Sequence, residues 1–108
     1  MRRGELWTAA GGKHYVGKPR PVLVVQDDRF DATDSITICP LTSDPTEIPL
    51  LRVQLNPRSN TGLAQPSSIM IDKLTTMPRS KLGERIGEVS DTDMLALSRA
   101  LVVFLGLA

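Results

Sequence analysis

The side chains best suited to chemistry in this sequence stand at the edges of its apolar runs. Arg20 directly precedes the most hydrophobic run, residues 21–25, and Thr42 and Ser43 follow the next one. Asp72 ends a further run. A small β domain gathers functional groups at its strand ends, because loops there are exposed and held by a rigid scaffold. Solvated turn residues give the same local pattern, so both interpretations stay open at this point.

The single cysteine and single histidine limit the kinds of catalytic centre that this chain can form. One cysteine cannot form an internal disulfide or supply a zinc cluster, which indicates a reducing compartment. No CxxC, HExxH, GxSxG, phosphate-loop or dinucleotide-binding motif is present. Cys39 lies in a strand pattern typical of core packing, although a nucleophilic pair of Cys39 with His14 stays open.

Charge is unevenly distributed along a chain whose net charge is only +1. Residues 1–20 carry five basic side chains and one acidic side chain, whereas residues 21–50 carry one basic and six acidic side chains. Such a split lets one basic face meet a polyanion, although a solvated surface with chance clustering would look the same. Aromatic residues make up 4% of the chain, too few for a platform that stacks several bases.

The 108 residues predict one mainly β domain with a helix at its C-terminal end. Alternating or continuous apolar patterns predict six short strands, at residues 5–9, 21–25, 35–39, 51–55, 68–72 and 86–89. Proline-rich and glycine-rich turns between them favour a small, partly open barrel. No apolar stretch is long enough for a membrane span and no signal peptide is visible, so we expect a cytoplasmic protein with no membrane partner.

A helix is predicted after Ser90, where the spacing to Asp93 resembles a capping box with the acid reaching back. Its apolar positions are typical of an amphipathic helix, and Gly106 can end it. They are Met94, Leu97, Leu101 and Leu105, flanked by Leu95, Val102 and Phe104. These side chains cannot all face one small barrel, so the helix is either a subunit interface or unusually well buried.

Several segments, in order along residues 2–107, resemble the MazF/Kid (PemK-like) toxins of bacterial toxin–antitoxin systems. They are Arg3-Gly4-Glu5-Leu6-Trp7, Arg20-Pro21-Val22-Leu23-Val24-Val25, Pro40-Leu41-Thr42-Ser43, Gly62-Leu63 through Ser67, the run into Asp72, and Ile86-Gly87-Glu88-Val89-Ser90. The resemblance implies an SH3-like, partly open barrel with a C-terminal helix, usually a homodimer. It also implies an endoribonuclease that cuts single-stranded mRNA at short sequences without the ribosome, a metal or another cofactor. A cognate antitoxin would neutralise it, and operator DNA would be bound only by the toxin–antitoxin complex.

The resemblance assigns the catalytic roles to Arg20, Thr42, Asp72 and His14, which stands six residues before Arg20. This chain departs from the family at two places. The Kid-like branch has an arginine where this chain has Met70, and many members have Arg-Thr-Ile-Asp where this chain has Thr75-Thr76-Met77-Pro78. The acid catalyst and the preferred cut site therefore remain open.

Cleavage of RNA without a metal uses the substrate's own 2′-hydroxyl as the nucleophile. In that reaction Arg20 would bind the phosphate with its planar fork of donors, and Thr42 would add a neutral donor. Asp72 is a candidate general base, and His14 suits either proton-transfer role. The expected RNA-binding residues are Lys13, Lys18, Ser43, Ser67, Met70 and Trp7; the tryptophan either stacks on a base or packs in the core.

Two other functions remain open from the sequence alone. One is a toxin of the same barrel architecture that binds DNA gyrase without cutting RNA. The other is a catalytically silent barrel that serves as a binding or autorepression module, which the methionine at position 70 keeps open.

Overall fold

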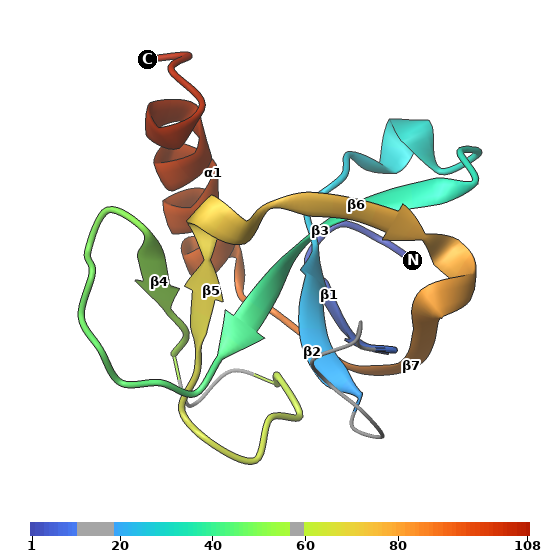
Figure 1. Ribbon diagram of the computed structural model, residues 1–108, viewed down its shortest axis with the longest axis horizontal. Helices are drawn as coiled ribbons and strands as arrows, with labels where there is room; N and C mark the ends of the chain where they lie inside the picture. Colours follow the sequence, from blue (N-terminus) through green and yellow to red (C-terminus); the bar gives the residue numbers. More distant parts are fainter. Residues whose placement is uncertain (11–18, 57–59) are drawn as a thin grey trace.

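The computed structural model describes residues 1–10, 19–56 and 60–108, which form a strongly curved antiparallel sheet with a helix beside it (Figure 1). The strands of this described part are β1 (Glu5–Ala9), β2 (Arg20–Val24), β3 (Ser35–Thr42), β4 (Arg52–Gln54), β5 (Ser68–Met70), β6 (Thr75–Pro78) and β7 (Leu82–Glu88). Three short 3-10 turns are η1 (Asp28–Phe30), η2 (Ile71–Lys73) and η3 (Arg79–Lys81), and the helix is α1 (Asp91–Phe104). The strand order is β4-β5-β3-β2-β1-β7, with β6 also on β3, and the sheet does not close, which confirms the partly open barrel.

The long strand β3 joins the two parts of the sheet (Figure 1). One of its edges pairs with β2, with Val22 opposite Pro40. The other edge pairs first with β6, up to Ile38, and then with β5, from Leu41. The predicted strand ended at Cys39, but β3 continues through Pro40 to Thr42. Pro40 lies where β3 changes partner on that second edge, a place where a residue without an N–H is tolerated.

β2 and β4 differ from the predicted strands by one residue at each end, and β6, β7 and β5 differ more. β6 was not predicted, because its four residues end in a proline and show no apolar alternation. β7 begins at Leu82 and not at Ile86, and its residues 83–85 are exposed, so they give no burial signal. The predicted strand 68–72 stops at Met70, where the chain turns into η2.

Two apolar clusters lie on opposite faces of the curved sheet. Leu23 packs with Leu6, Leu41 and Leu97 in the first cluster, which α1 covers. Val22 and Val24 belong to the second cluster, with the isoleucines of β3. The alternation of β2 between the two clusters explains why its apolar run is continuous.

Segment 60–62 lies directly against β7 through backbone contact. A Cβ atom at Gly87 would overlap the carbonyl oxygen of Thr61, and one at Gly62 would overlap that of Ile86. Gly62 also has a positive φ of 70°, which side chains rarely adopt. The N–H of Glu88 donates to the carbonyl of Asn60 at 3.0 Å, so this segment is attached to β7 by its main chain.

The caps of α1 explain where it begins and ends. The Ser90 hydroxyl accepts from the Asp93 N–H at 3.2 Å, as the capping pattern predicts. The Asp93 carboxylate does not reach back to complete a capping box; it accepts from the N–H of Asn56 at 3.0 Å and so holds the preceding loop. Gly106, with φ 74°, ends the helix: its N–H donates to the carbonyl of Val103 at 3.1 Å, and the N–H of Leu107 donates to that of Val102 at 2.8 Å.

The predicted apolar stripe of α1 is only partly buried. Leu97 is fully buried, and Met94 and Leu101 pack against the first cluster. Leu105, which the same stripe includes, is exposed, as is Leu95. Within residues 1–10, 19–56 and 60–108, no helix has the length and apolar character needed to cross a membrane.

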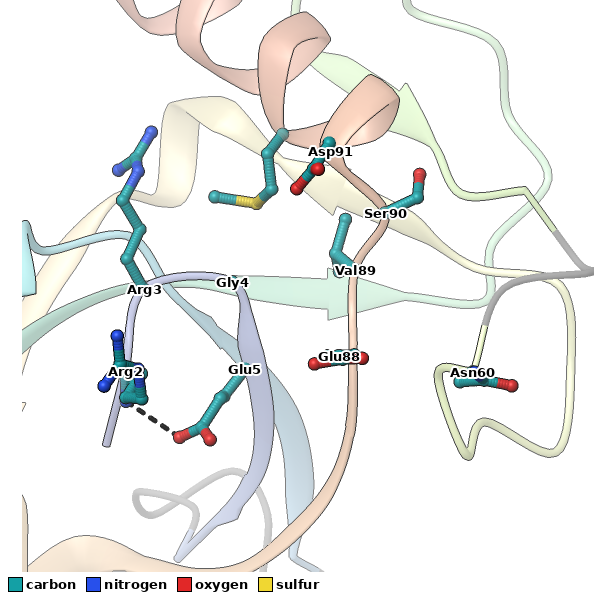
Figure 2. A pocket seen from close by; sticks show the side chains of 10 residues that line it. Arg2, Arg3, Gly4, Glu5, Asn60, Glu88, Val89, Ser90 and Asp91 are labelled. Atoms are coloured by element: carbon teal, nitrogen blue, oxygen red, sulfur yellow. Dashed lines mark hydrogen bonds between the residues drawn. The ribbon is translucent and has the colours of Figure 1, made fainter.

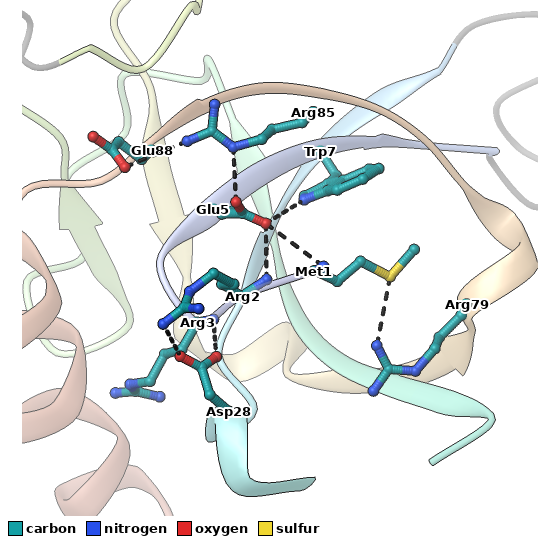
Figure 3. Close-up of polar contacts among 9 residues, drawn as sticks. All are labelled: Met1, Arg2, Arg3, Glu5, Trp7, Asp28, Arg79, Arg85 and Glu88. Atoms are coloured by element: carbon teal, nitrogen blue, oxygen red, sulfur yellow. Dashed lines mark hydrogen bonds and ion pairs between the residues drawn. The ribbon is translucent and has the colours of Figure 1, made fainter. Parts of the chain in front are cut away.

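Glu5 is the centre of the polar contacts at the start of β1 (Figure 3). Its carboxylate accepts from the Arg2 N–H at 2.8 Å, the Trp7 indole N–H at 3.1 Å and the Arg85 guanidinium at 2.8 Å. Burial of Glu5 opposes its charge, but these hydrogen bonds outweigh burial and hold the pKa of the carboxyl below its usual range.

We expect the substitution Glu5→Gln to lower the free energy of unfolding at pH 7 by about 1–3 kcal/mol, because it leaves ionic hydrogen bonds unmatched. A carboxyl whose pKa is depressed by folding stabilises the protein fully above its unfolded pKa of about 4.3 and stops doing so as pH falls through the folded pKa. The difference between variant and wild type should therefore shrink at pH 3, which urea unfolding at both pH values measures.

The matched control is Glu88→Gln. Glu88 is 61% exposed and forms one ion pair with the same arginine at 3.3 Å, so its loss should cost less than about 1 kcal/mol. Equal effects of the two substitutions, or a Glu5 effect that does not change with pH, would contradict this account of Glu5.

Candidate active site

A cavity of about 630 Å³ opens where the start of β2 meets the end of β3. Because the two strands are antiparallel, Arg20 at the first position of β2 lies near the last residues of β3. Arg20, Thr42 and Ser43 all line the cavity, as do the expected RNA-binding residues Ser67 and Met70. The fold thus brings together five of the residues that the sequence singled out.

Thr42 is held so that its hydroxyl proton is left for a ligand. Its oxygen accepts from the Asp44 N–H at 3.1 Å, and among the described residues it donates to none. The Asp44 carboxylate accepts from the Thr46 hydroxyl and N–H, at 2.7 and 2.9 Å, and these bonds lower the pKa of Asp44. The negative charge of Asp44 is therefore held within its own turn, and Thr42 can act as a donor.

The cavity also contains polar residues that the sequence reasoning missed. Thr8, Gln65 and Thr75 line it. The Thr8 hydroxyl accepts from the Glu84 N–H at 2.9 Å, beside an irregularity in the pairing of β1 with β7. Gly83 makes room for it, since a Cβ there would lie 2.7 Å from the Thr8 oxygen. Only the register of β1 and β7 reveals this placement, and no local pattern signals it.

Asp72 is not among the residues that line this cavity. Since β5 stops at Met70, Asp72 lies in η2, and its carboxylate accepts from the Arg52 guanidinium at 2.5 Å. The same Arg52 nitrogen also donates to the carbonyl of Leu51 at 2.9 Å. The predicted convergence of Asp72 with Arg20 and Thr42 is therefore not what the structure shows. Pairing with a side chain on β4 has taken its place.

Trp7 and the basic loop residues differ from the other predicted RNA-binding residues. Trp7 does not line the cavity; it packs against the second apolar cluster, and its indole N–H donates to Glu5. The core interpretation of Trp7 therefore holds. Lys13, His14 and Lys18 lie outside the described residues.

Arg20 is the one ionisable side chain in the described part of the cavity lining. The rest of that lining consists of hydroxyl, amide and apolar side chains. The described walls can therefore bind and polarise an anion, but they offer no carboxylate or imidazole to accept a proton. In residues 1–10, 19–56 and 60–108, moreover, no three His, Cys, Asp or Glu side chains are grouped as metal ligands.

A second cavity, of about 460 Å³, lies at the base of α1 and shares no lining residue with the first (Figure 2). Its wall includes the turn from Arg2 to Glu5 and the segment from Glu88 to Asp91. The Arg3 guanidinium beside it donates to the Ser98 hydroxyl at 2.9 Å and to the carbonyl of Val25. Arg3 thus holds the chain's first residues to α1 and to the residue that follows β2.

Cys39 is fully buried on β3, and burial, with a smaller contribution from the charge of Asp72, raises the pKa of its thiol to about 12. A thiolate is therefore scarce at neutral pH, which argues against Cys39 as a nucleophile paired with His14.

We expect a thiol reagent such as iodoacetamide to leave Cys39 of the folded protein unlabelled at pH 7.5, because the thiol is buried and protonated, and to label it fully in urea. Mass spectrometry measures both, and rapid labelling of the folded protein would contradict this.

Comparison with known proteins agrees with the fold. The model of the PemK-like, MazF-like toxins of type II toxin–antitoxin systems matches residues 2–105. The chain is 56% identical over 108 residues to a probable endoribonuclease MazF of Mycolicibacterium smegmatis, covering 100% of this chain and 99% of the relative. It is 31% identical over 117 residues to endoribonuclease MazF9 of Mycobacterium tuberculosis, covering 99% and 98%.

A similar solved structure is an endoribonuclease in complex with its cognate antitoxin from Mycobacterial species. The TM-score is 0.84 at 25% sequence identity, and the match covers 100% of this chain and 97% of the other. With the family model spanning nearly the whole sequence, the chain belongs to the PemK-like, MazF-like toxins of type II toxin–antitoxin systems.

Proposed function

We propose that this MazF-type endoribonuclease toxin cuts single-stranded mRNA at a short sequence, without a metal ion, by attack of the substrate's own 2′-hydroxyl. The observation that carries the proposal is that Arg20 and Thr42, from different strands, line one open cavity. A guanidinium and a hydroxyl placed in this way form a site for a phosphodiester. The requirement for a 2′-hydroxyl excludes DNA as a substrate.

The substrate phosphate binds between the strand ends. Arg20 donates to its non-bridging oxygens and stays charged throughout the reaction. Thr42 donates its free proton to the same group, and Ser43 lies beside it. These donors stabilise the phosphate most strongly in the transition state, where negative charge accumulates on its oxygens.

The reaction consists of one displacement at phosphorus. The 2′-hydroxyl loses its proton to a general base while its oxygen forms a bond to phosphorus. The bond from phosphorus to the 5′-oxygen breaks, and that oxygen takes a proton from a general acid. The products are a 2′,3′-cyclic phosphate on one fragment and a 5′-hydroxyl on the other.

We assign proton transfer to His14, the one histidine of the chain. The described lining offers no acceptor for the proton, and Asp72 is paired with Arg52. An imidazole titrates near neutral pH and suits either proton-transfer role. His14 belongs to the segment that joins β1 to β2, directly before Arg20. Lys13 and Lys18 of this segment would add salt-sensitive contacts to neighbouring phosphates.

Membership in this toxin family also supports two partners for the chain, a cognate antitoxin and operator DNA. The antitoxin binds the toxin through an acidic segment that becomes ordered on binding, and this segment covers the cavity. Operator DNA is then a partner of the toxin–antitoxin complex only. The proposed setting is the cytoplasm, where mRNA is present.

A homodimer through α1 accounts for the apolar residues that the helix exposes. The described residues leave nine large hydrophobic side chains exposed, and six of them lie on α1 or just after it: Leu95, Val102, Val103, Phe104, Leu105 and Leu107. Exposed apolar side chains gathered on one element mark an interaction surface.

The test of the function is cleavage of a long unstructured RNA in EDTA. We expect the wild type to cut at a short recurring sequence and to leave 2′,3′-cyclic phosphate and 5′-hydroxyl ends. Arg20→Ala should slow cleavage by at least about 100-fold, because a charged donor to the transition state is lost. Thr42→Val, which removes only the hydroxyl, should slow it by about 10-fold or more. End mapping and initial rates measure both effects.

The control is Arg29→Ala, because Arg29 is 81% exposed and pairs with Asp27 away from the cavity. It should cleave at the wild-type rate. A folded wild type that leaves diverse RNAs intact would overturn the proposal and favour gyrase binding or a silent module. Activity that disappears only in EDTA would overturn the metal-free mechanism.

The test of the dimer is sedimentation of the wild type and of the Leu95→Glu, Val102→Glu double variant. The two residues lie two helical turns apart on α1 and are 52% and 39% exposed. We expect twice the chain mass of 11.8 kDa for the wild type and a single chain mass for the variant. The control is Leu50→Glu, which lies outside α1 at a position that is 75% exposed; this variant should remain dimeric. A monomeric wild type would contradict the interface.

A further inference from the structure

A row of three polar residues runs outward from Thr42 across the small sheet of β3, β5 and β4. Thr42 pairs with Ser68 of β5, and Ser68 pairs with Gln54 of β4. Residues directly opposite each other in antiparallel strands present their side chains on the same face. Two strand spacings separate the ends of the row, so Gln54 lies about 10 Å from Thr42.

The alternate residues of the same strands identify which face this is. Leu41 pairs with Ile69, and Ile69 pairs with Val53. Leu41 and Ile69 are buried in the first apolar cluster, and Val53 packs against it. The row from Thr42 to Gln54 therefore lies on the opposite face, together with Met70, which lines the cavity.

Gln54 is the group on this face that is best placed to read a ligand. Ser68 is only 7% exposed, and Met70 carries no strong hydrogen-bonding group. Arg52, opposite Met70, is engaged by Asp72 and by the carbonyl of Leu51. Gln54 is exposed, and its amide makes no hydrogen bond to any described residue.

We propose that Gln54 is a specificity-determining residue whose side-chain amide reads the edge of one base near the scissile phosphate. The inference rests on the proposed function, because it needs an RNA strand whose phosphate lies between Arg20 and Thr42. An amide presents a donor beside an acceptor, which matches the paired groups on the edge of a base. Bases of single-stranded RNA can be splayed onto such a face and read on their edges.

The neighbouring Arg52–Asp72 pair supports this role for Gln54. Its two side chains are 16% and 25% exposed, and they neutralise each other. A base beside the pair therefore meets no net charge, and Gln54 supplies the directional contact. Arg52 also attaches β4 to η2, which holds Gln54 in register with Ser68.

The experiment maps every cut on a long RNA of mixed sequence for the wild type, Gln54→Ala and Gln54→Glu, in EDTA. We expect Gln54→Ala to weaken the preference at one nucleotide position near the cut by about 10-fold, the effect of losing one paired base contact. The rate at the wild type's weaker sites should remain unchanged. Gln54→Glu should lose the same preference, because a carboxylate keeps the acceptor but cannot donate.

The control is Glu84→Ala, an exposed position on β7, which stands at the opposite end of the strand order from β4. Its cut profile should match that of the wild type, and equal urea midpoints will show that all variants are folded. A Gln54→Ala profile identical to the wild type's would overturn this inference while leaving the proposed function intact. A wild type that cuts nothing would overturn the proposed function itself.

Discussion

The double pairing of β3 is the constraint on which the rest of the structure depends. One edge of this strand holds β2, and the other holds β6 and then β5. The first pairing places Arg20 near the end of β3, and the last places Thr42 beside Ser68. A cationic and a hydroxylic donor thus meet at one strand end, although nothing links them locally along the chain. Shortening β3 to its predicted end at Cys39 would have removed Thr42 from the sheet.

The described cavity lining contains hydrogen-bond donors for an anion but no carboxylate or imidazole that could accept a proton. Its walls supply donors: a guanidinium, several hydroxyls and an amide. Groups of this kind hold a phosphate and stabilise developing charge, but they do not remove a proton. Asp72, the carboxylate to which the family resemblance assigned a catalytic role, is paired with Arg52, so that the pair joins η2 to β4. In the proposed function, phosphate binding and proton transfer therefore fall to separate parts of the chain, with His14 as the proposed counterpart to Arg20.

Local patterns predicted what depends on local physics. The continuous apolar run of β2, the alternation along β3 and the Ser90 cap of α1 each report burial or a neighbouring N–H, and each is present. Contacts between residues far apart in the sequence have no local sequence pattern and were not predicted. The Arg52–Asp72 pair joins residues twenty positions apart, and β6 exists because β3 offers it an edge. The expected reach of Asp93 to its own cap failed for the same reason, since Asn56 offers a competing N–H.

Segment 60–62 is attached to β7 by main-chain atoms, so the support of the adjoining cavity wall does not depend on which side chains line the cavity. The close approach at Gly62 and Gly87 and the bond from Glu88 to Asn60 use main-chain atoms. The wall that follows, from Leu63 to Ser67, contributes side chains to the cavity without carrying that support. Substitutions among those side chains can therefore change which ligand groups the wall accepts, while the main-chain attachment that supports it is kept.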